Sequence, residues 1–396
     1  MTEFKRLAAT LAVVALLALA PVGVAAAGAV GVQPQTQEQI QAQTQEQIQA
    51  QTQTTCEFPV TTTDATGTEV TVTERPERVT TLQPSAAQTM WEIGGRDQVV
   101  GVSKYATYLD GAGERTNIST GGFGGASVEK VVGTEPDLVL APNVVRNETI
   151  QSLRNAGLTV FKFEGAGDIA DVRQKTTLIG KLTGNCAGAA EANAWMTANV
   201  EAVSEATADT ERPTVLYPLS GGFVVGEETF ITQMIRAAGG QNVFRGEISG
   251  YREVSSEVVL TSEPDVVVFG DTTAYLAGEK PYRQLSAVQQ NRTVTVNTNW
   301  LNQPAPRSVV YGVRNLSAGV APETTADVSF PARDEVSVAT ETPTATETPE
   351  PAATETPEPT ATETPEPTTS TSAPGMGAVV ALVAAGVAAL LGRRRA

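Results

Sequence analysis

Two glutamates stand in nearly the same phrase at two places in the chain. Residues 128–142 read VEKVVGTEPDLVLAP, and residues 256–270 read SEVVLTSEPDVVVFG. In each phrase a glutamate, Glu129 or Glu257, precedes a Glu-Pro-Asp turn and a run of Val and Leu. Proline ends a helix and the branched run suits a buried parallel strand, so each phrase predicts a helix, a turn and a strand. The carboxylates can contact a cationic partner, or they can stabilise helix N-termini as capping sequences do. The repetition predicts two lobes on one plan.

The sequence contains few of the residues and motifs that enzymes use for catalysis. The 396 residues include no histidine, which excludes Ser-His-Asp and Cys-His catalysis, histidine zinc sites and a histidine ligand for haem. A G-x-S-x-G elbow, a Walker phosphate loop and a C-x-x-C pair are absent too. The net charge of −17 argues against nucleic acid as a partner. We therefore expect a binding protein rather than an enzyme, with no catalytic residue, no bound metal and no cofactor.

The elements around the two phrases alternate short apolar strands with helical stretches, which is typical of α/β domains. Residues 168–210 are rich in alanine, lack proline and carry apolar residues at helical spacing. They predict a helix interrupted near Gly184, whose long half at 187–208 spans about 33 Å at 1.5 Å per residue. The expected fold is α/β, with two similar lobes joined by a long interlobe helix and a ligand cleft between them.

Both ends of the chain differ from this globular part. Lys5 and Arg6, the apolar run at 7–20 and the alanines at 25–27 predict a secretory signal, with a retained membrane anchor as the alternative. A glutamine-rich repeat follows and predicts a solvated linker, or else a helical arm. Export permits a disulfide between Cys56 and Cys186, although two buried thiols are the alternative.

The C-terminal end combines a Thr-Glu-Pro repeat, an apolar run and three arginines. Proline and repelling charges predict an extended stalk, and the final arginines would hold that end in the cytoplasm. The expected organisation is a signal peptide at 1–27, a Gln-rich linker at 28–56, an N-terminal lobe at 57–167, the interlobe helix at 168–210, a C-terminal lobe at 211–322, a stalk at 323–374 and an anchor segment at 375–396.

This end resembles the PGF-CTERM sorting signal of archaeal surface proteins, with Met376 where that motif has Phe. The resemblance implies that an archaeosortase-like enzyme replaces the apolar tail with a lipid. It also implies anchoring on the outer face of the cell membrane. The acidic composition, with more arginine than lysine, is similar to that of secreted haloarchaeal proteins.

The globular part resembles the substrate-binding proteins of ABC importers for cobalamin and iron–siderophore complexes. The resemblance rests on RPERVTTLQPSAAQTMWEIGG, SVEKVVGTEPDLVLA, FVVGEETFITQMIRAAGGQNVF and VSSEVVLTSEPDVVVFG, in the family's order. It implies a monomer that binds a metal-chelate ligand between its lobes and delivers it to an ABC permease dimer with its ATPase. It also implies that Glu129 and Glu257 dock against permease arginines.

Loops at the carboxyl ends of the strands supply the expected ligand contacts, because ligands of open α/β sheets bind there. The aromatic side chains suit a large planar ligand, and few arginines lie near. We therefore favour a corrinoid over a ferric siderophore or haem; a surface adhesion protein and an ectoenzyme are the rivals from other classes. The candidate residues are Gln83, Ser85, Tyr105, Phe123, Tyr217, Phe223, Tyr251 and Trp300.

Four N-x-S/T sequons are candidate glycosylation sites in an exported protein. They begin at Asn117, Asn147, Asn291 and Asn315.

Overall fold

The computed structural model describes residues 56–120, 125–336 and 338. The chain divides into two compact units, 1–341 and 342–396, and every described residue belongs to the first. The predicted signal peptide, nearly all of the Gln-rich linker, Phe123, most of the stalk and the anchor segment lie outside the described residues.

The N-terminal lobe is built on a five-stranded parallel sheet with strand order β5-β4-β3-β6-β7. Every residue of β6 is buried, as expected for a parallel strand covered on both faces. An antiparallel pair, β1 and β2, precedes the sheet. The bounds are β1 Val60–Thr63, β2 Glu69–Val72, β3 Val79–Thr81, β4 Val99–Val102, β5 Thr116–Asn117, β6 Leu138–Ala141, β7 Val160–Lys162, α2 Pro84–Glu92, α3 Val128–Val132 and α4 Asn147–Asn155.

The C-terminal lobe repeats this plan with a four-stranded parallel sheet of order β10-β8-β12-β13. Strands β9 and β11 form a separate antiparallel pair. The two sheets confirm the α/β fold with two similar lobes. The bounds are β8 Thr214–Leu216, β9 Phe223–Val225, β10 Gln241–Asn242, β11 Tyr251–Glu253, β12 Val266–Gly270, β13 Thr293–Val296, α7 Phe230–Ala237, α8 Ser256–Thr261, α9 Ser286–Gln289 and α10 Thr298–Asn302.

The repeated phrase has the same architecture in both lobes. A short helix, α3 or α8, is followed within three residues by a left-handed glutamate, Glu135 with φ 44° or Glu263 with φ 41°. The aspartate after the proline then caps the start of a neighbouring strand. Asp137 accepts hydrogen bonds from the amides of Glu77 and Arg78 at 2.9 and 2.8 Å. Asp265 accepts one from the Thr214 amide at 2.8 Å. The Pro-Asp pair is thus explained by the need to satisfy free backbone donors beside a strand.

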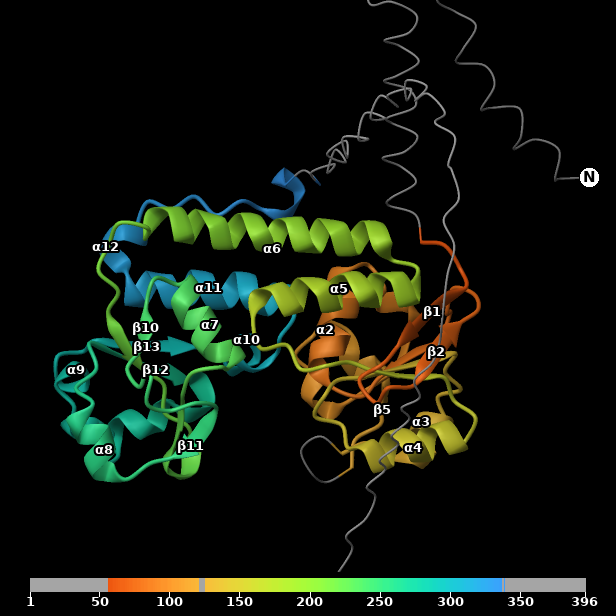
Figure 1. Cartoon of the computed structure of the whole chain (residues 1–396), viewed down its shortest axis with the longest axis horizontal. Helices are drawn as coiled ribbons and strands as arrows, with labels where there is room; N and C mark the ends of the chain where they lie inside the picture. The colour runs from red at the N-terminus through yellow and green to blue at the C-terminus, as the bar shows by residue number, and fades with distance from the viewer. Residues whose placement is uncertain (1–55, 121–124, 337, 339–396) are drawn as a thin grey trace, which may run out of the picture. The chain divides into compact units, whose positions relative to one another are not determined.

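Two helices connect the lobes, α5 (Ile169–Thr183) and α6 (Cys186–Ala206). The chain turns between them at Gly184, whose φ of 73° favours glycine, so the predicted interruption is confirmed. Figure 1 shows α6 running past both lobes. Residues of α5 and α6 contribute to the hydrophobic core of each lobe, and Cys186 is disulfide-bonded to Cys56 with Cα atoms 5.6 Å apart. The two helices therefore fix the lobes to a common support.

The folded chain extends further toward the C-terminus than we expected. After α11 (Pro306–Val320) comes α12 (Pro322–Thr325), and residues through 336 pack against α6 and α11 where we placed the start of the stalk. Within the described ranges, no helix has both the length and the apolar character to cross a bilayer. Short 3-10 turns lie at η1 Arg96–Gln98, η2 Lys104–Ala106, η3 Ala112–Glu114, η4 Ser220–Gly222, η5 Asp271–Gly278, η6 Tyr282–Gln284 and η7 Arg333–Glu335.

Candidate functional site

Three exposed aromatic rings gather on the C-terminal lobe. The β9–β11 register pairs Phe223 with Glu253 and Tyr251 with Val225, so Phe223 and Tyr251 point to the same face of the strand pair. Their side chains are 40% and 52% exposed. Tyr275 of η5 is 59% exposed, and its hydroxyl lies 3.2 Å from that of Ser220 in the turn before Phe223. We call Phe223, Tyr251 and Tyr275 the aromatic surface.

Tyr217, a predicted ligand contact, follows β8 and is more buried than we expected. Its side chain is 1% exposed and belongs to the core of the lobe. Burial, with smaller contributions from Tyr251 and Asp271, raises the pKa of the Tyr217 hydroxyl well above its usual value. Tyr217 therefore lies beneath the aromatic surface and stays protonated.

Gln83 and Ser85, at the end of β3 and the start of α2, are also more buried than we expected. They are 3% and 5% exposed, and Gln83 occupies the N-cap position without a capping hydrogen bond from its side chain. The partly exposed tyrosines of the N-terminal lobe instead lie in the segment that follows β4. Tyr105 is half-buried with the Lys104 ammonium 5.0 Å from its ring centre, and Tyr108 is half-buried nearby in the sequence.

Gln88 connects the two lobes and was missed by the sequence analysis. Its fully buried side chain donates a hydrogen bond to the Tyr108 hydroxyl at 2.8 Å. Its carbonyl oxygen accepts bonds from the amide and the hydroxyl of Ser308, both at 3.0 Å, at the start of α11. Burial raises the pKa of Tyr108 to about 12. A glutamine inside the apolar pattern of α2 was the signal that could have revealed this link.

Glu92, at the end of α2, carries a second link between the lobes. The carboxylate is 5% exposed and forms an ion pair with Arg307 of α11 at 2.5 Å. Arg333 of η7 pairs with the same carboxylate at 3.1 Å. A charge so buried is stable only when it is paired, and Arg307 and Arg333 supply that pairing at the junction of the lobes.

Trp300 lies in α10 and is half-buried. Its ring packs on Tyr311 with centroids 5.1 Å apart, and Tyr311 also contacts Trp195 at 6.0 Å. These contacts assign Trp300 mainly to packing beside the core rather than to an open loop.

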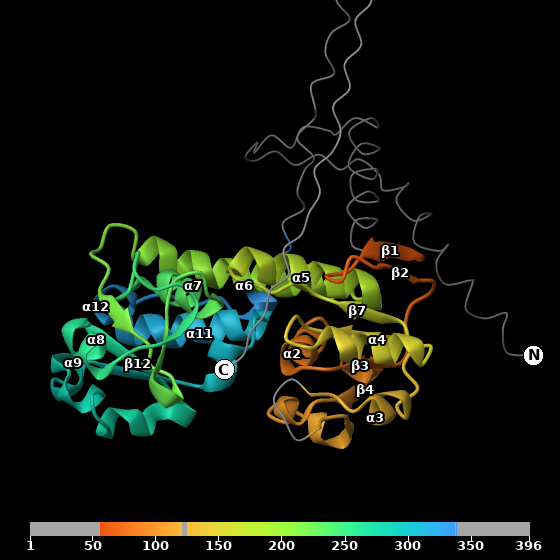
Figure 2. The same cartoon turned by 60° about the horizontal axis from the view of Figure 1, so that its bottom comes forward.

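Glu129 and Glu257 occupy equivalent, exposed positions in the first turns of α3 and α8. The preceding serines are the N-caps: Ser127 accepts a hydrogen bond from the Lys130 amide, and Ser255 accepts one from the Val258 amide, each at 3.3 Å. In Figures 1 and 2, α3 and α8 lie on the side of their lobes away from α6. The serines therefore cap the two helices, and each glutamate lies in the first turn, where the helix dipole favours a negative charge. Among the described residues, neither carboxylate forms an ion pair or a side-chain hydrogen bond.

The four sequons differ in their surroundings. The side-chain oxygen of Asn117 accepts a hydrogen bond from the Ser119 amide, and that of Asn147 accepts one from the Lys162 ammonium. Asn315 lies within α11 and donates to the Tyr311 carbonyl at 2.7 Å, while the hydroxyl-bearing residue of its sequon, Ser317, is fully buried. Asn291 lies exposed in the turn before the edge strand β13, with φ 57°.

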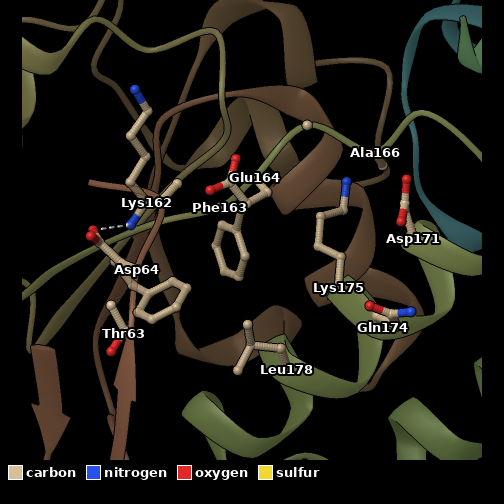
Figure 3. Close-up of a pocket in the computed structure, with 13 residues that line it drawn as sticks. Thr63, Asp64, Lys162, Phe163, Glu164, Ala166, Asp171, Gln174, Lys175 and Leu178 are labelled. Atoms are coloured by element: carbon tan, nitrogen blue, oxygen red, sulfur yellow. Dashed lines mark hydrogen bonds between the residues drawn. The ribbon is translucent and has the colours of Figure 1, made fainter. Parts of the chain in front are cut away.

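A separate cavity of about 240 Å³ lies in the N-terminal lobe beside β7 and α5 (Figure 3). Figure 3 shows Phe163 pointing into it above Leu178, with the Lys175 ammonium at its rim. Lys175 is 8% exposed, and its ammonium donates to the Pro304 carbonyl just before α11. Burial lowers the pKa of Lys175 to about 7, and Asp171 opposes this shift. The cavity is lined by Thr63, Asp64, Ala65, Phe161, Lys162, Phe163, Glu164, Gly165, Ala166, Asp171, Gln174, Lys175 and Leu178.

Grouped metal ligands are not found in the described ranges, where no cluster of three or more His, Cys, Asp or Glu could hold an ion. The candidate site instead contains exposed aromatic rings, buried hydrogen bonds and exposed carboxylates.

Known proteins share both the sequence and the fold. A cobalamin-binding protein of Halobacterium salinarum is 49% identical over 273 residues, which cover 66% of this chain and 74% of that protein. The solved periplasmic vitamin B12-binding protein of Vibrio cholerae superposes with a TM-score of 0.55 at 22% identity, covering 62% of this chain and 97% of that one. A periplasmic haem-binding protein solved with two haems gives a TM-score of 0.55 at 26% identity over 62% of this chain and all of its own. The periplasmic binding protein family matches residues 79–297. The chain belongs to that family.

Proposed function

We propose that this protein captures a corrinoid outside the cell and delivers it to an ABC permease. The observation that carries the proposal is the 49% identity to a relative named as a cobalamin-binding protein. The aromatic surface supports it, because Phe223, Tyr251 and Tyr275 offer broad apolar faces to a large ring. Binding leaves such a ligand chemically unchanged, so no catalytic group is needed.

The ligand would lie between the lobes, with the aromatic surface on one side and Tyr105 and Tyr108 on the other. Tyr108 is held by Gln88, whose bonds to Ser308 fix the position of the N-terminal lobe relative to α11. Such fixed contacts favour a site that is largely preformed, which reduces the entropy lost on binding. In this proposal Gln83, Ser85 and Tyr217 support the site from within, since they are nearly fully buried.

Delivery would use Glu129 and Glu257 as a pair of contacts to cationic side chains of a two-fold permease. Both carboxylates are exposed, and each belongs to the same phrase of its lobe. Charge complementarity of this kind mainly sets orientation and association rate. Glu129→Ala with Glu257→Ala should impair uptake by cells and leave corrinoid affinity unchanged; lost affinity would contradict the assignment.

Membrane attachment is proposed from the sequence of the C-terminal segment. The apolar run and the three arginines, together with the likeness to a PGF-CTERM signal, support processing by an archaeosortase-like enzyme. Mass spectrometry of the mature C-terminus tests this: a chain that retains its final arginines would contradict it.

The ligand is tested by titrating the chain with cyanocobalamin, haemin and ferric chelates while following tryptophan fluorescence. Saturable quenching by cyanocobalamin is expected, and Tyr251→Ala should weaken it roughly tenfold through lost stacking and burial. Tyr251→Phe is the matched control, since it keeps the ring. Saturation by haemin alone would identify a haem-binding protein instead, and no response to any ligand would favour an adhesion role.

A further inference from the structure

Residues 328–336 form a segment that we call the strap. Figure 1 shows it returning from α12 along α6, and its last turn, η7, reaches the N-terminal lobe. The strap follows the last helices of the C-terminal lobe, so it crosses from one lobe to the other.

The middle of the strap is held by the carbonyl of the half-buried Pro331. The Pro331 oxygen accepts three hydrogen bonds, from the Trp195 indole at 3.2 Å, the Asn199 amide at 3.2 Å and the Arg314 guanidinium at 2.9 Å. Asn199 is fully buried, and the Arg314 guanidinium lies 4.9 Å from the Phe330 ring centre. This density of specific contacts is unlike that of a solvated stalk.

The end of the strap is held by Glu92 of α2. The Arg333 guanidinium donates to the Glu92 carboxylate at 3.1 Å and to the Gly188 carbonyl of α6 at 3.4 Å. Glu191 adds a longer ion pair at 3.9 Å. Because the Glu92 carboxylate is 5% exposed, its pairing with the arginines is little screened by water.

Glu92 also pairs with Arg307, which directly precedes Ser308 in α11. Ser308 donates to Gln88, and Gln88 in turn donates to the Tyr108 hydroxyl. One carboxylate thus connects the strap with the N-terminal side of the proposed ligand site. If Arg333 were removed, Arg307 would be the one arginine left to pair with the Glu92 carboxylate. Arg307 would then shift toward the carboxylate oxygen that Arg333 had occupied.

We propose that the strap locks the two lobes together through Glu92, and that Arg333 is a positioning residue that holds Arg307 at the ligand site. The lock is a property of the folded chain alone. The positioning role rests on the proposed function.

The lock is tested by limited digestion of the full chain with a glutamyl endopeptidase, with cleavage between Glu335 and Val336 followed by mass spectrometry. Arg333→Gln should speed this cleavage about tenfold, since local opening of the strap becomes easier. Arg333→Lys keeps the charge but not the forked geometry, so its cleavage rate should lie between those of the wild type and Arg333→Gln. Arg283→Gln, at an exposed arginine of η6, is the control and should be cleaved at the wild-type rate. Glu92→Gln is the second variant and should resemble Arg333→Gln. Wild-type cleavage rates in both would overturn the lock.

Positioning is tested by the cyanocobalamin dissociation constant of the same folded variants. Arg333→Gln should raise it several-fold while Arg283→Gln leaves it unchanged; equal values in both would overturn the positioning role. A wild-type chain that fails to bind cyanocobalamin would refute the proposed ligand, and the digestion would still decide the lock.

Discussion

Lys175 should make the stability of this protein depend on pH in a range where few other groups titrate. The side chain is 8% exposed, and burial lowers its pKa from 10.5 to about 7 in the folded protein. In the unfolded chain the amine returns to its ordinary pKa and binds a proton that the folded state does not. Stability therefore rises with pH between the two pKa values, where the unfolded state binds more protons. Below about pH 7 both states are charged, so the cost of burying the ammonium is then fully present.

The size of the effect follows from those two pKa values. For one proton the slope is at most about 1.4 kcal/mol per pH unit, and between about pH 7.5 and about pH 9.5 the gain is about 2.5 kcal/mol. The chain has no histidine to add a slope at the lower end of this range. Burial also raises the pKa values of Tyr108 and Tyr217, so these hydroxyls do not titrate within it.

Urea unfolding at several pH values measures this directly, because the midpoint follows stability while the slope with denaturant stays constant. The wild type should gain stability over the range, and Lys175→Met should show no gain. Lys181→Met, at an exposed lysine of the same helix, is the control and should behave as the wild type. A wild-type midpoint that does not change with pH would refute the burial of a neutral amine at this site.

Three further outcomes are expected. Asp137→Ala should lower the free energy of unfolding by about 2 kcal/mol, because two backbone amides lose a charged acceptor; the urea midpoint measures this, and Asp137→Asn should lose less. Reducing the Cys56–Cys186 bridge should cost about 2–5 kcal/mol, visible as a lower urea midpoint with reductant, and an unchanged midpoint would contradict the pairing. Peptide mass spectrometry of the native protein should find glycan at Asn291, which lies in an exposed turn, and none at Asn315, which lies within α11; the reverse pattern would contradict this reasoning.

Local patterns in the sequence were enough to predict the two lobes. Proline, the Val and Leu runs and the Glu-Pro-Asp turns act over a few residues, so the repeated phrase indicates a helix and a strand in each lobe. Gly184 likewise indicated the break between α5 and α6, because a left-handed residue there favours glycine.

Burial of single side chains was not predictable in the same way. Gln83, Ser85 and Tyr217 lie at strand ends, as expected, yet each faces inward, since the direction of a loop depends on packing against distant elements. Tyr275, on the aromatic surface, follows no motif that would single it out.

The sequence by itself determined the fold class, the repeated lobes and the exposed pair of glutamates, because those depend on local propensity and short-range pattern. Only the tertiary structure decided that Gln88, Glu92 and Lys175 are buried where the lobes meet, and that the strap folds back onto Glu92. The physical reason is that a polar side chain can be buried only beside partners from remote parts of the chain, such as Ser308, Arg307 and Pro304, and linear spacing does not reveal those pairs.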